Sequence, residues 1–256
     1  MKQNQTIRDV WFNMLSDGES SHRRMYHILG MLPSEPRCKL CNAPFRGIGK
    51  FIIRLMGKRQ SKQNPYFCNP CLASAPVGGA EVELTMLFAD VRGSTTLAER
   101  MSASEFSELM KRFYKVATEV FVKSDALIDK VVGDEVIGLY VPGYAGPRHA
   151  RQAVHGAQEL LRVTGHGDSS GPWLPVGVGV HTGIAYVGTV GGDDGILTDI
   201  TALGDNVNIT ARLASKASAG EILITDPAFT AAGINFGNLE QRRLDLKGKS
   251  EQVSVR

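Results

Sequence analysis

Apolar residues recur at helical spacing near the start of the chain. They would share one helix face, at positions Ile7, Val10, Trp11, Met14 and Leu15. Ser16-Asp17-Gly18 ends this run, and a second apolar group stops at Gly30, shortly before Pro33. The pattern therefore predicts two short helices over residues 6–31, within an N-terminal helical segment at 1–35.

From Glu81 onward, short apolar runs alternate with longer amphipathic stretches. Strands are predicted at Val82–Ala89, Ala126–Val132, Glu135–Val141, Leu174–His181, Ala185–Val190 and Glu221–Thr225. Helices are predicted at Ser102–Ser124, Pro147–Thr164 and Asn206–Ala217. Arg243–Lys247 and Gln252–Val255 are expected to close the sheet. The alternation predicts an α+β fold, with one sheet packed against helices.

Composition and charge separate the chain into two parts. With 43% hydrophobic and 21% charged residues, the 256-residue chain is neither disordered in bulk nor collagen-like. Residues 1–80 hold 12 Lys/Arg and 4 Asp/Glu, a net charge of +8, and the remainder holds 17 and 22, a net charge of −5. A linker rich in Ala, Pro and Gly runs from 73 to 80. A basic head on an acidic body indicates two modules with different partners.

The apolar runs are too short for a membrane helix, and the start MKQNQTIRDV is too polar for a signal peptide. We therefore expect a soluble, cytoplasmic protein. In such a reducing compartment, clustered cysteines indicate a metal site rather than disulfides.

The four cysteines form two CxxC pairs, Cys38/Cys41 and Cys68/Cys71. This spacing predicts a zinc-finger-like module over residues 36–75, in which four thiolates hold one structural Zn²⁺ and the second pair opens a helix. An iron–sulfur cluster also uses four cysteines and stays open as an alternative. Four thiols without a metal are the remaining reading.

An apolar stripe with basic neighbours lies between the cysteine pairs. Its apolar members are Ile48, Phe51, Ile52, Leu55 and Met56, and its basic members are Arg46, Lys50, Arg54, Lys58 and Lys62. A basic amphipathic helix over 46–62 can contact an anionic surface, a regulatory partner or a nucleic acid. The stripe is more often the docked side of a helix with a solvated opposite face, and we expect that arrangement here.

Two acidic residues stand at matched strand ends. Asp90 ends an apolar strand and precedes a Gly-Ser-Thr turn, and Asp134 lies at the tip of the predicted hairpin. If these strands are neighbours, both carboxylates project from one end of the sheet, beside backbone N–H groups that suit phosphate. Such a pair suits Mg²⁺. Taken singly, Asp90 could be a helix cap and Asp134 a turn residue.

Three motifs, FADVRGST, KVVGDEV and TALGDNVNITAR, follow one another in the order and near the spacing of a known family. They resemble the class III nucleotidyl cyclase domain of adenylyl and guanylyl cyclases. The resemblance covers about 84–256 and implies a ferredoxin-like βαββαβ catalytic domain, which we place at 81–256.

The resemblance implies that Asp90, Asp134 and the Val91 carbonyl bind two Mg²⁺ or Mn²⁺ ions. It implies that the Gly93, Ser94 and Thr95 backbone holds the triphosphate. An acidic pair with two metal ions suits in-line attack of the ribose 3′-oxygen on the α-phosphorus.

By the same resemblance, Lys130 and Thr201 read the base; a Lys donor suits adenine N1. Many family members have Asp where this chain has Thr201, and the Thr resembles a bacterial and soluble subclass. Asn208 and Arg212, four residues apart on one helix, match the ribose-orienting Asn and the transition-state Arg. Lys247, in a KG turn, matches a phosphate contact. Read singly, Lys130 and Lys247 could be solvated lysines.

The implied activity is conversion of ATP to cyclic AMP and pyrophosphate. Since the family forms its sites between two domains and this chain carries one copy of each half, we expect a homodimer with two equivalent sites. Alternatives are a partner- or nucleic-acid-binding zinc module with a nucleotide-sensing cyclase-like domain, a guanylyl cyclase, or a diguanylate cyclase. VGDEV is similar to the diguanylate signature, but NVNITAR has no counterpart there.

Overall fold

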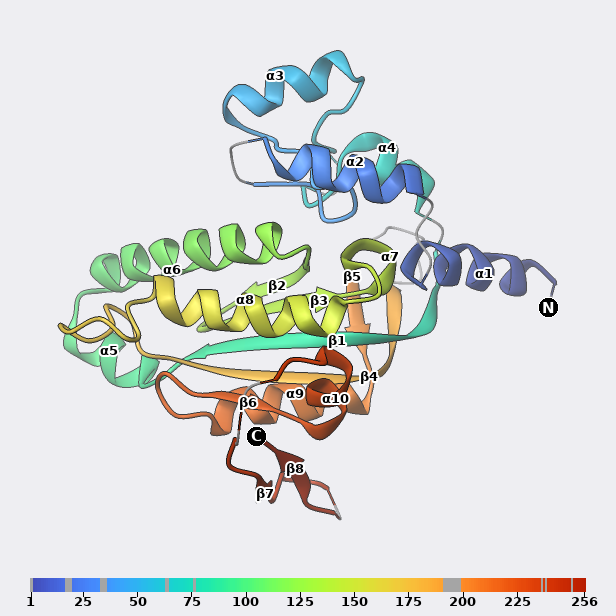
Figure 1. Ribbon diagram of the computed structural model, residues 1–256. Coiled ribbons are helices and arrows are strands. Elements are labelled where there is room, and N and C mark those ends of the chain that lie inside the picture. Colours follow the sequence, from blue (N-terminus) through green and yellow to red (C-terminus); the bar gives the residue numbers. More distant parts are fainter. Residues whose placement is uncertain are drawn as a thin grey trace.

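A mixed six-stranded sheet lies at the centre of the molecule (Figure 1). The computed structural model describes residues 2–16, 20–32, 36–62, 65–75, 77–190, 199–235, 237, 239–249 and 251–256. The side chains of residues 2–5, 20–22 and 130–132 are outside this description. The predicted end of the first helix at Asp17-Gly18 therefore lies outside the described residues, and the part of that helix that is described ends at Ser16.

The strands are β1 (Gly79–Val91), β2 (Leu127–Val132), β3 (Glu135–Tyr140), β4 (Val176–Val190), β5 (Asp199–Leu203) and β6 (Ile222–Ile224). Their order is β2-β3-β1-β4-β5, with β6 pairing parallel to β4 and the other neighbours antiparallel. The order β4-β1-β3-β2 within this sheet is that of a ferredoxin-like βαββαβ unit. The predicted α+β fold class is confirmed.

The helices that follow the N-terminus in chain order are α1 (Lys2–Ser16), α2 (Ser20–Gly30), α3 (Gly47–Leu55), α4 (Asn69–Ser74), α5 (Ser94–Arg100), α6 (Ala103–Lys123), α7 (Pro142–Ala145), α8 (His149–Val163), α9 (Asp205–Lys216) and α10 (Asp226–Ala232). The two helices predicted over 6–31 and those at 102–124, 147–164 and 206–217 are thus confirmed. Ser102 begins α6 with a capping box to Glu105, which explains the sharp start of that helix.

Strand β1 is buried on both faces, because helices cover the sheet on either side. Leu87, Ala89 and Val91 belong to one apolar core with residues of α6 and α8. Met86 and Phe88 point to the other core, which contains Ala214 of α9 and Trp11 of α1. An interior strand of this kind reads as a continuous apolar run, as the segment LTMLFADV does.

Helix α9 packs very closely on β4. A Cβ atom at Gly179 would stand 2.6 Å from the backbone nitrogen of Ala214, and one at Gly177 would stand 2.6 Å from the Ala217 carbonyl oxygen. Only glycine allows such an approach. The glycines of this strand therefore fix where α9, which carries Asn208 and Arg212, lies relative to the sheet.

Two predictions for the sheet differ from the structure, and one strand was not predicted. Leu174–His181 and Ala185–Val190 belong to one strand, β4, because Thr182-Gly183 stays paired with β1 instead of turning. The C-terminal strands β7 (Arg242–Leu244) and β8 (Val253–Val255) form a separate two-stranded sheet, which joins the central sheet only where Val255 and Arg256 pair with Thr225 and Ile224 at the end of β6. Strand β5 was not predicted, since its sequence DITAL is short and lacks a clear alternation.

The apolar stripe between the cysteine pairs is not docked, contrary to the expectation. Of helix α3, only Gly49 and Ile53 are buried, while the five stripe residues face solvent. The helix is also shorter than the predicted 46–62 stretch, since Gly57 follows it with a positive φ of 72°.

The sheet is so strongly curled that its two edge strands meet. Thr201 of β5 donates a hydrogen bond of 2.9 Å to the Asp129 carboxylate of β2. The N-terminal part of the chain covers β2, where the Tyr26 hydroxyl donates to the Ala126 carbonyl at 2.7 Å.

Among the described helices, none combines the length and the apolar character that crossing a bilayer requires.

Candidate active site

The two predicted metal-binding acids meet at the end of β1. Asp90 stands directly opposite Glu135 in the ladder between β1 and β3, and Asp134 is the preceding turn residue. The Val91 amide donates to the Asp134 carbonyl at 3.0 Å, which holds the hairpin tip against β1. The structure therefore brings Asp90, Val91 and Asp134 together, as the sequence predicted.

Both carboxylates already have protein partners. Arg92 forms an ion pair with Asp90, and its guanidinium also donates to the Ser215 carbonyl of α9 at 2.7 Å. Ser94 donates a short hydrogen bond to Asp134. Arg92 thus neutralises Asp90 and ties the end of β1 to α9.

The site concentrates negative charge in partly buried surroundings. Burial raises the pKa of Asp90, Arg92 lowers it in part, and Asp134 raises it further. Burial, with Asp90 and Asp134 nearby, raises the pKa of Glu135 to about 7. The carboxylates of this site carry more negative charge than the neighbouring Arg92 balances. Hard carboxylate oxygens of this kind are suited to a divalent cation such as Mg²⁺.

The turn after Asp90 is suited to close contact with a ligand. Gly93 precedes α5 with a positive φ of 69°, and the space where its Cβ would stand is open. A depression of about 740 Å³ beside it is lined by Ser94, Thr95, Tyr114 and Asp134, among others. Tyr114 donates to the Gly133 carbonyl and so supports the hairpin tip. Gly93, Ser94 and Thr95 thus lie together at this depression, and their contact with a triphosphate stays a prediction.

The predicted base-reading residues lie on the two edge strands. Thr201 is 2% exposed, and its hydroxyl donates to Asp129. Lys130 follows Asp129 in β2, but its side chain lies outside the described residues. The register between β2 and β3 shifts at Ile128/Lys130, so Asp129 is the extra residue of a bulge. The bulge explains how Asp129 turns toward Thr201.

Lys39, from the first cysteine pair, bridges these same two strands. Its ammonium donates to the Asp129 carbonyl at 2.6 Å and pairs with the Asp199 carboxylate at 2.5 Å. Because Asp129 is the extra residue of the bulge, its carbonyl lies outside the regular β2–β3 register. Lys39 donates a hydrogen bond to this carbonyl. The cysteine module therefore contacts the strands that carry Lys130 and Thr201.

Asn208 and Arg212 lie on α9, and the C-terminal turn lies beside Arg212. A Cβ at Gly248 would stand 3.4 Å from an Arg212 guanidinium nitrogen, so this turn lies beside that guanidinium. Lys249 forms an ion pair with Asp205 at the start of α9. Lys247 is exposed. The structure thus places the Lys247-Gly248 turn beside Arg212, and a phosphate contact by Lys247 stays a prediction.

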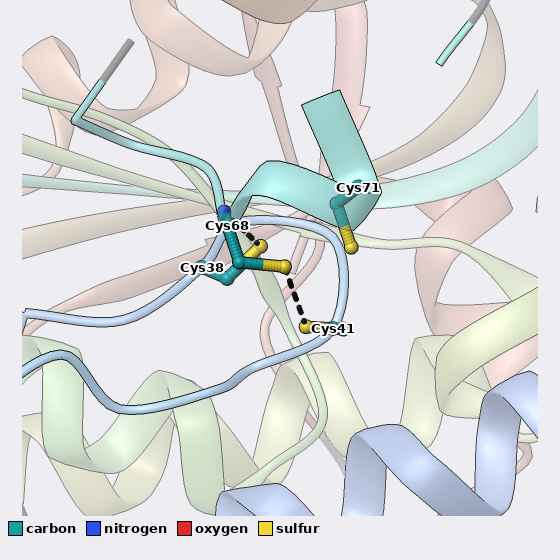
Figure 2. A group of neighbouring side chains, drawn as sticks. All are labelled: Cys38, Cys41, Cys68 and Cys71. Carbon is teal, nitrogen blue, oxygen red and sulfur yellow. Dashed lines mark hydrogen bonds between the residues drawn. The ribbon is translucent and has the colours of Figure 1, made fainter. Parts of the chain in front are cut away.

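Figure 2 shows that the four cysteine side chains converge at the start of α4. Their sulfur atoms all lie within 4.8 Å of one another, and those of Cys41 and Cys68 are 3.7 Å apart. Tetrahedral zinc thiolates, with bonds of about 2.3 Å, place neighbouring sulfurs about 3.8 Å apart. A four-iron cluster would hold its thiolates on separate irons and farther apart. The arrangement therefore fits a single tetrahedral ion.

Sequence reasoning missed three residues that shape the site, namely Arg92, Asp129 and Lys39. Arg92 is two residues after Asp90, which is a spacing that could have suggested an ion pair. Asp129 and Lys39 gave no local signal, because their contacts join segments 72 and 90 residues apart in the chain.

Comparison with known proteins gives the same family as these motifs. The adenylate and guanylate cyclase catalytic domain family matches residues 80–255. An adenylate cyclase of Anabaena cylindrica is 29% identical over 189 residues, which are 70% of this chain and 37% of the relative. The chain thus spans little more than a third of that relative's length.

Two solved structures have the same fold over the cyclase region. The guanylyl cyclase Cya2 has a TM-score of 0.62 at 27% identity, covering 70% of this chain and 92% of that one. The adenylyl cyclase CyaB from P. aeruginosa has a TM-score of 0.59 at 27% identity, covering 70% and 94%. Because the family match spans more than half of the chain and includes both acids and α9, this chain belongs to the adenylate and guanylate cyclase catalytic domain family.

Proposed function

We propose that this chain is an adenylyl cyclase that converts ATP to 3′,5′-cyclic AMP and pyrophosphate. The observation that carries the proposal is the convergence of Asp90 and Asp134 at the end of β1, beside the open turn at Gly93. Two carboxylates next to a backbone that a phosphate can approach are suited to phosphoryl transfer.

Asp90, Asp134 and the Val91 carbonyl would hold two divalent cations, Mg²⁺ or Mn²⁺. When bound, these ions lower the pKa of the ribose 3′-hydroxyl and neutralise phosphate charge. Ser94 keeps the Asp134 carboxylate oriented by its hydrogen bond. The Gly93–Thr95 backbone would accept the triphosphate, since no side chain of Gly93 obstructs it.

Arg212, Asn208 and Lys247 would act on the other side of the nucleotide. The Arg212 guanidinium can contact two phosphate oxygens at once, which suits the charge that develops as pyrophosphate leaves. Asn208 is exposed one helical turn before it and would orient the ribose. Lys247, exposed in the turn beside Arg212, would add a phosphate contact.

The contact between Thr201 and Asp129 supports adenine over guanine. The single hydroxyl proton of Thr201 is donated to Asp129, so its oxygen can only accept a further hydrogen bond. The adenine amino group is a donor, whereas the guanine oxygen at the same ring position is an acceptor. Because Thr201 is buried in the single chain, the side chains around it must open before a base can reach it.

Asp129→Asn is expected to weaken the preference for ATP. The asparagine amide can donate to Thr201, which frees the hydroxyl to donate to guanine. We expect the ratio of kcat/KM for ATP to that for GTP to fall up to about tenfold, the worth of one neutral hydrogen bond. Asp168→Asn, on an exposed loop, is the control. An unchanged ratio would show that Asp129 does not determine whether the Thr201 hydroxyl donates a hydrogen bond to the base or accepts one from it.

We propose that the active form is a homodimer with two equivalent sites. Within one chain, Asp90 is paired with Arg92, whereas Arg212 lies against the Gly248 turn. A nucleotide that needs both the acids and Arg212 would take the acids from one copy and Arg212 from the other. Two-fold symmetry then gives two such sites.

A mixture of two inactive variants tests this arrangement. Asp90→Ala and Arg212→Ala are each expected to abolish turnover as homodimers. Co-expression should restore about a quarter of the normal activity, because half of the dimers are mixed and one of their two sites is intact. The measurement is cyclic AMP formed per chain. If the mixture is as inactive as either variant alone, all groups of the site belong to one chain.

Product analysis tests the proposed activity itself. Purified protein is incubated with ATP or GTP and with Mg²⁺ or Mn²⁺, and the products are separated by chromatography. We expect 3′,5′-cyclic AMP and pyrophosphate from ATP, and much less cyclic GMP from GTP. Cyclic GMP as the main product would make the chain a guanylyl cyclase, and a cyclic dinucleotide would make it a diguanylate cyclase.

We further propose a division into the N-terminal helices at 1–35, a zinc module at 36–75 and the catalytic domain at 81–256. The single-ion geometry of the four sulfurs supports zinc over an iron–sulfur cluster. The Lys39 contacts support a role for the module in organising the base-reading strands. Elemental analysis of the purified chain distinguishes zinc from iron.

A further inference from the structure

Helix α3 presents an exposed apolar face, here called the α3 patch, which consists of Ile48, Phe51, Ile52, Leu55 and Met56. Phe51 is 68% exposed and Leu55 is 91% exposed, whereas Ile53 on the opposite side is 1% exposed and anchors the helix. In Figure 1, α3 lies on the side of the cysteine module that is farthest from the central sheet. Clustered large apolar side chains at such a protruding position mark an interaction site.

The charge around the α3 patch has one sign. The segment between Cys41 and Cys68 contains no Asp or Glu, and its basic residues are Arg46, Lys50, Arg54, Lys58, Arg59 and Lys62. All but Lys58 are exposed. An apolar face flanked by cations is the pattern of a helix that lies in the interface of an anionic membrane.

We propose that the α3 patch docks the chain on an anionic lipid bilayer. Phe51, Leu55 and Ile48 enter the boundary between headgroups and acyl chains, while Lys50 and Arg54 contact lipid phosphates. The cysteine pairs on either side hold α3 as a preformed helix, so little ordering is needed on binding. The inference is independent of the proposed cyclase activity.

Charge complementarity favours a bilayer over the other possible occupants. A second copy docking through the same patch would bring two sets of six cations together, which is repulsive. One nine-residue helix also offers less area than the roughly 800 Å² per partner of a stable protein interface. A nucleic acid would satisfy the cations but would leave the α3 patch in water.

Vesicle sedimentation with the full chain tests the proposal. Vesicles of phosphatidylcholine alone are compared with vesicles in which about a third of the lipid is phosphatidylserine, at low and high salt. We expect binding to the anionic vesicles at least about tenfold stronger than to the neutral ones, and weakened by salt. Equal binding to both, or sedimentation with neither, would overturn the proposal.

Paired variants separate the apolar and the charged contributions. Phe51→Ser/Leu55→Ser is expected to weaken vesicle binding about tenfold or more, because two inserted side chains are lost. Lys50→Gln/Arg54→Gln should weaken binding and reduce its salt dependence. The control is Met31→Ser/Ile184→Ser, which removes two exposed apolar residues outside the patch.

Three results with these variants would contradict the proposal. If Phe51→Ser/Leu55→Ser binds vesicles as the parent does, the patch is not the membrane contact. If the same variant instead turns a dimer into a monomer on gel filtration, the patch is an interface between copies. If it abolishes binding of duplex DNA or RNA and leaves vesicle binding unchanged, the occupant is a nucleic acid. Circular dichroism and metal content verify folding of each variant.

Discussion

Asp134→Asn is expected to lower cyclic AMP formation about a thousandfold, an effect of the same order as those of Asp90→Ala and Arg212→Ala. Asparagine keeps the shape of Asp134 and can still accept the hydrogen bond from Ser94. What it removes is one of the two charges that would hold the cations. The fold should survive, because Asp134 lies in a turn at the surface end of the hairpin.

The measurement is kcat with ATP and Mn²⁺, together with the oligomeric state on gel filtration. Glu108→Gln is the matched control, since Glu108 is an exposed acid of α6 whose partner is Lys111. We expect the control to keep normal turnover and both variants to keep the parent's oligomeric state. Turnover by Asp134→Asn above about a tenth of the parent's would contradict the metal-binding role and with it the proposed chemistry.

Cys68→Ser is expected to leave the chain without bound zinc and to open residues 36–75 to proteolysis. Residues 36–75 contribute few buried apolar side chains of their own, namely Leu40, Ala43, Phe45, Ile53 and Phe67 besides Cys38 and Cys68. A core of this size seldom folds alone, and structural zinc supplies on the order of 10 kcal/mol to such modules. Cys68 is the N-cap residue of α4 but makes no side-chain cap hydrogen bond, and serine is a favoured N-cap residue, so the substitution tests the loss of the thiolate rather than of a cap.

Limited proteolysis followed by mass spectrometry measures this effect, with zinc content determined on the same sample. We expect cleavage within 36–75 to be faster by about a hundredfold or more, and the sheet from β1 onward to stay resistant. Ser74→Ala, at the exposed end of α4, should behave as the parent. Full resistance of Cys68→Ser, or of the parent after chelation, would mean that the module folds without a metal.

The catalytic side of the fold was predictable because its signals are local. The apolar run ending in Asp90 and the Gly133-Asp134 turn each fit within ten residues, and pairing of β1 with β3 places the acids together. The same holds for α9, where Asn208 and Arg212 are one turn apart. The convergence of the four cysteines was likewise predictable from their spacing alone.

Features that depend on curvature and docking were not predictable in this way. The meeting of β2 and β5 follows from the twist of the whole sheet, so the Thr201–Asp129 contact has no counterpart in either local sequence. The exposure of α3 was predicted wrongly, since an amphipathic stripe has the same pattern whether a neighbour covers it or not. Strand β5 was missed because five residues carry too little periodicity.

The contact between strands β2 and β5 has a practical consequence for handling the protein. Edge strands with free backbone groups promote aggregation, and here β2 faces β5, Lys39 occupies the Asp129 carbonyl of β2, and Tyr26 occupies the carbonyl of Ala126 just before that strand. A truncated chain that starts at Gly79 would lose both of these covers. Such a catalytic fragment should therefore precipitate more readily during purification than the intact chain does.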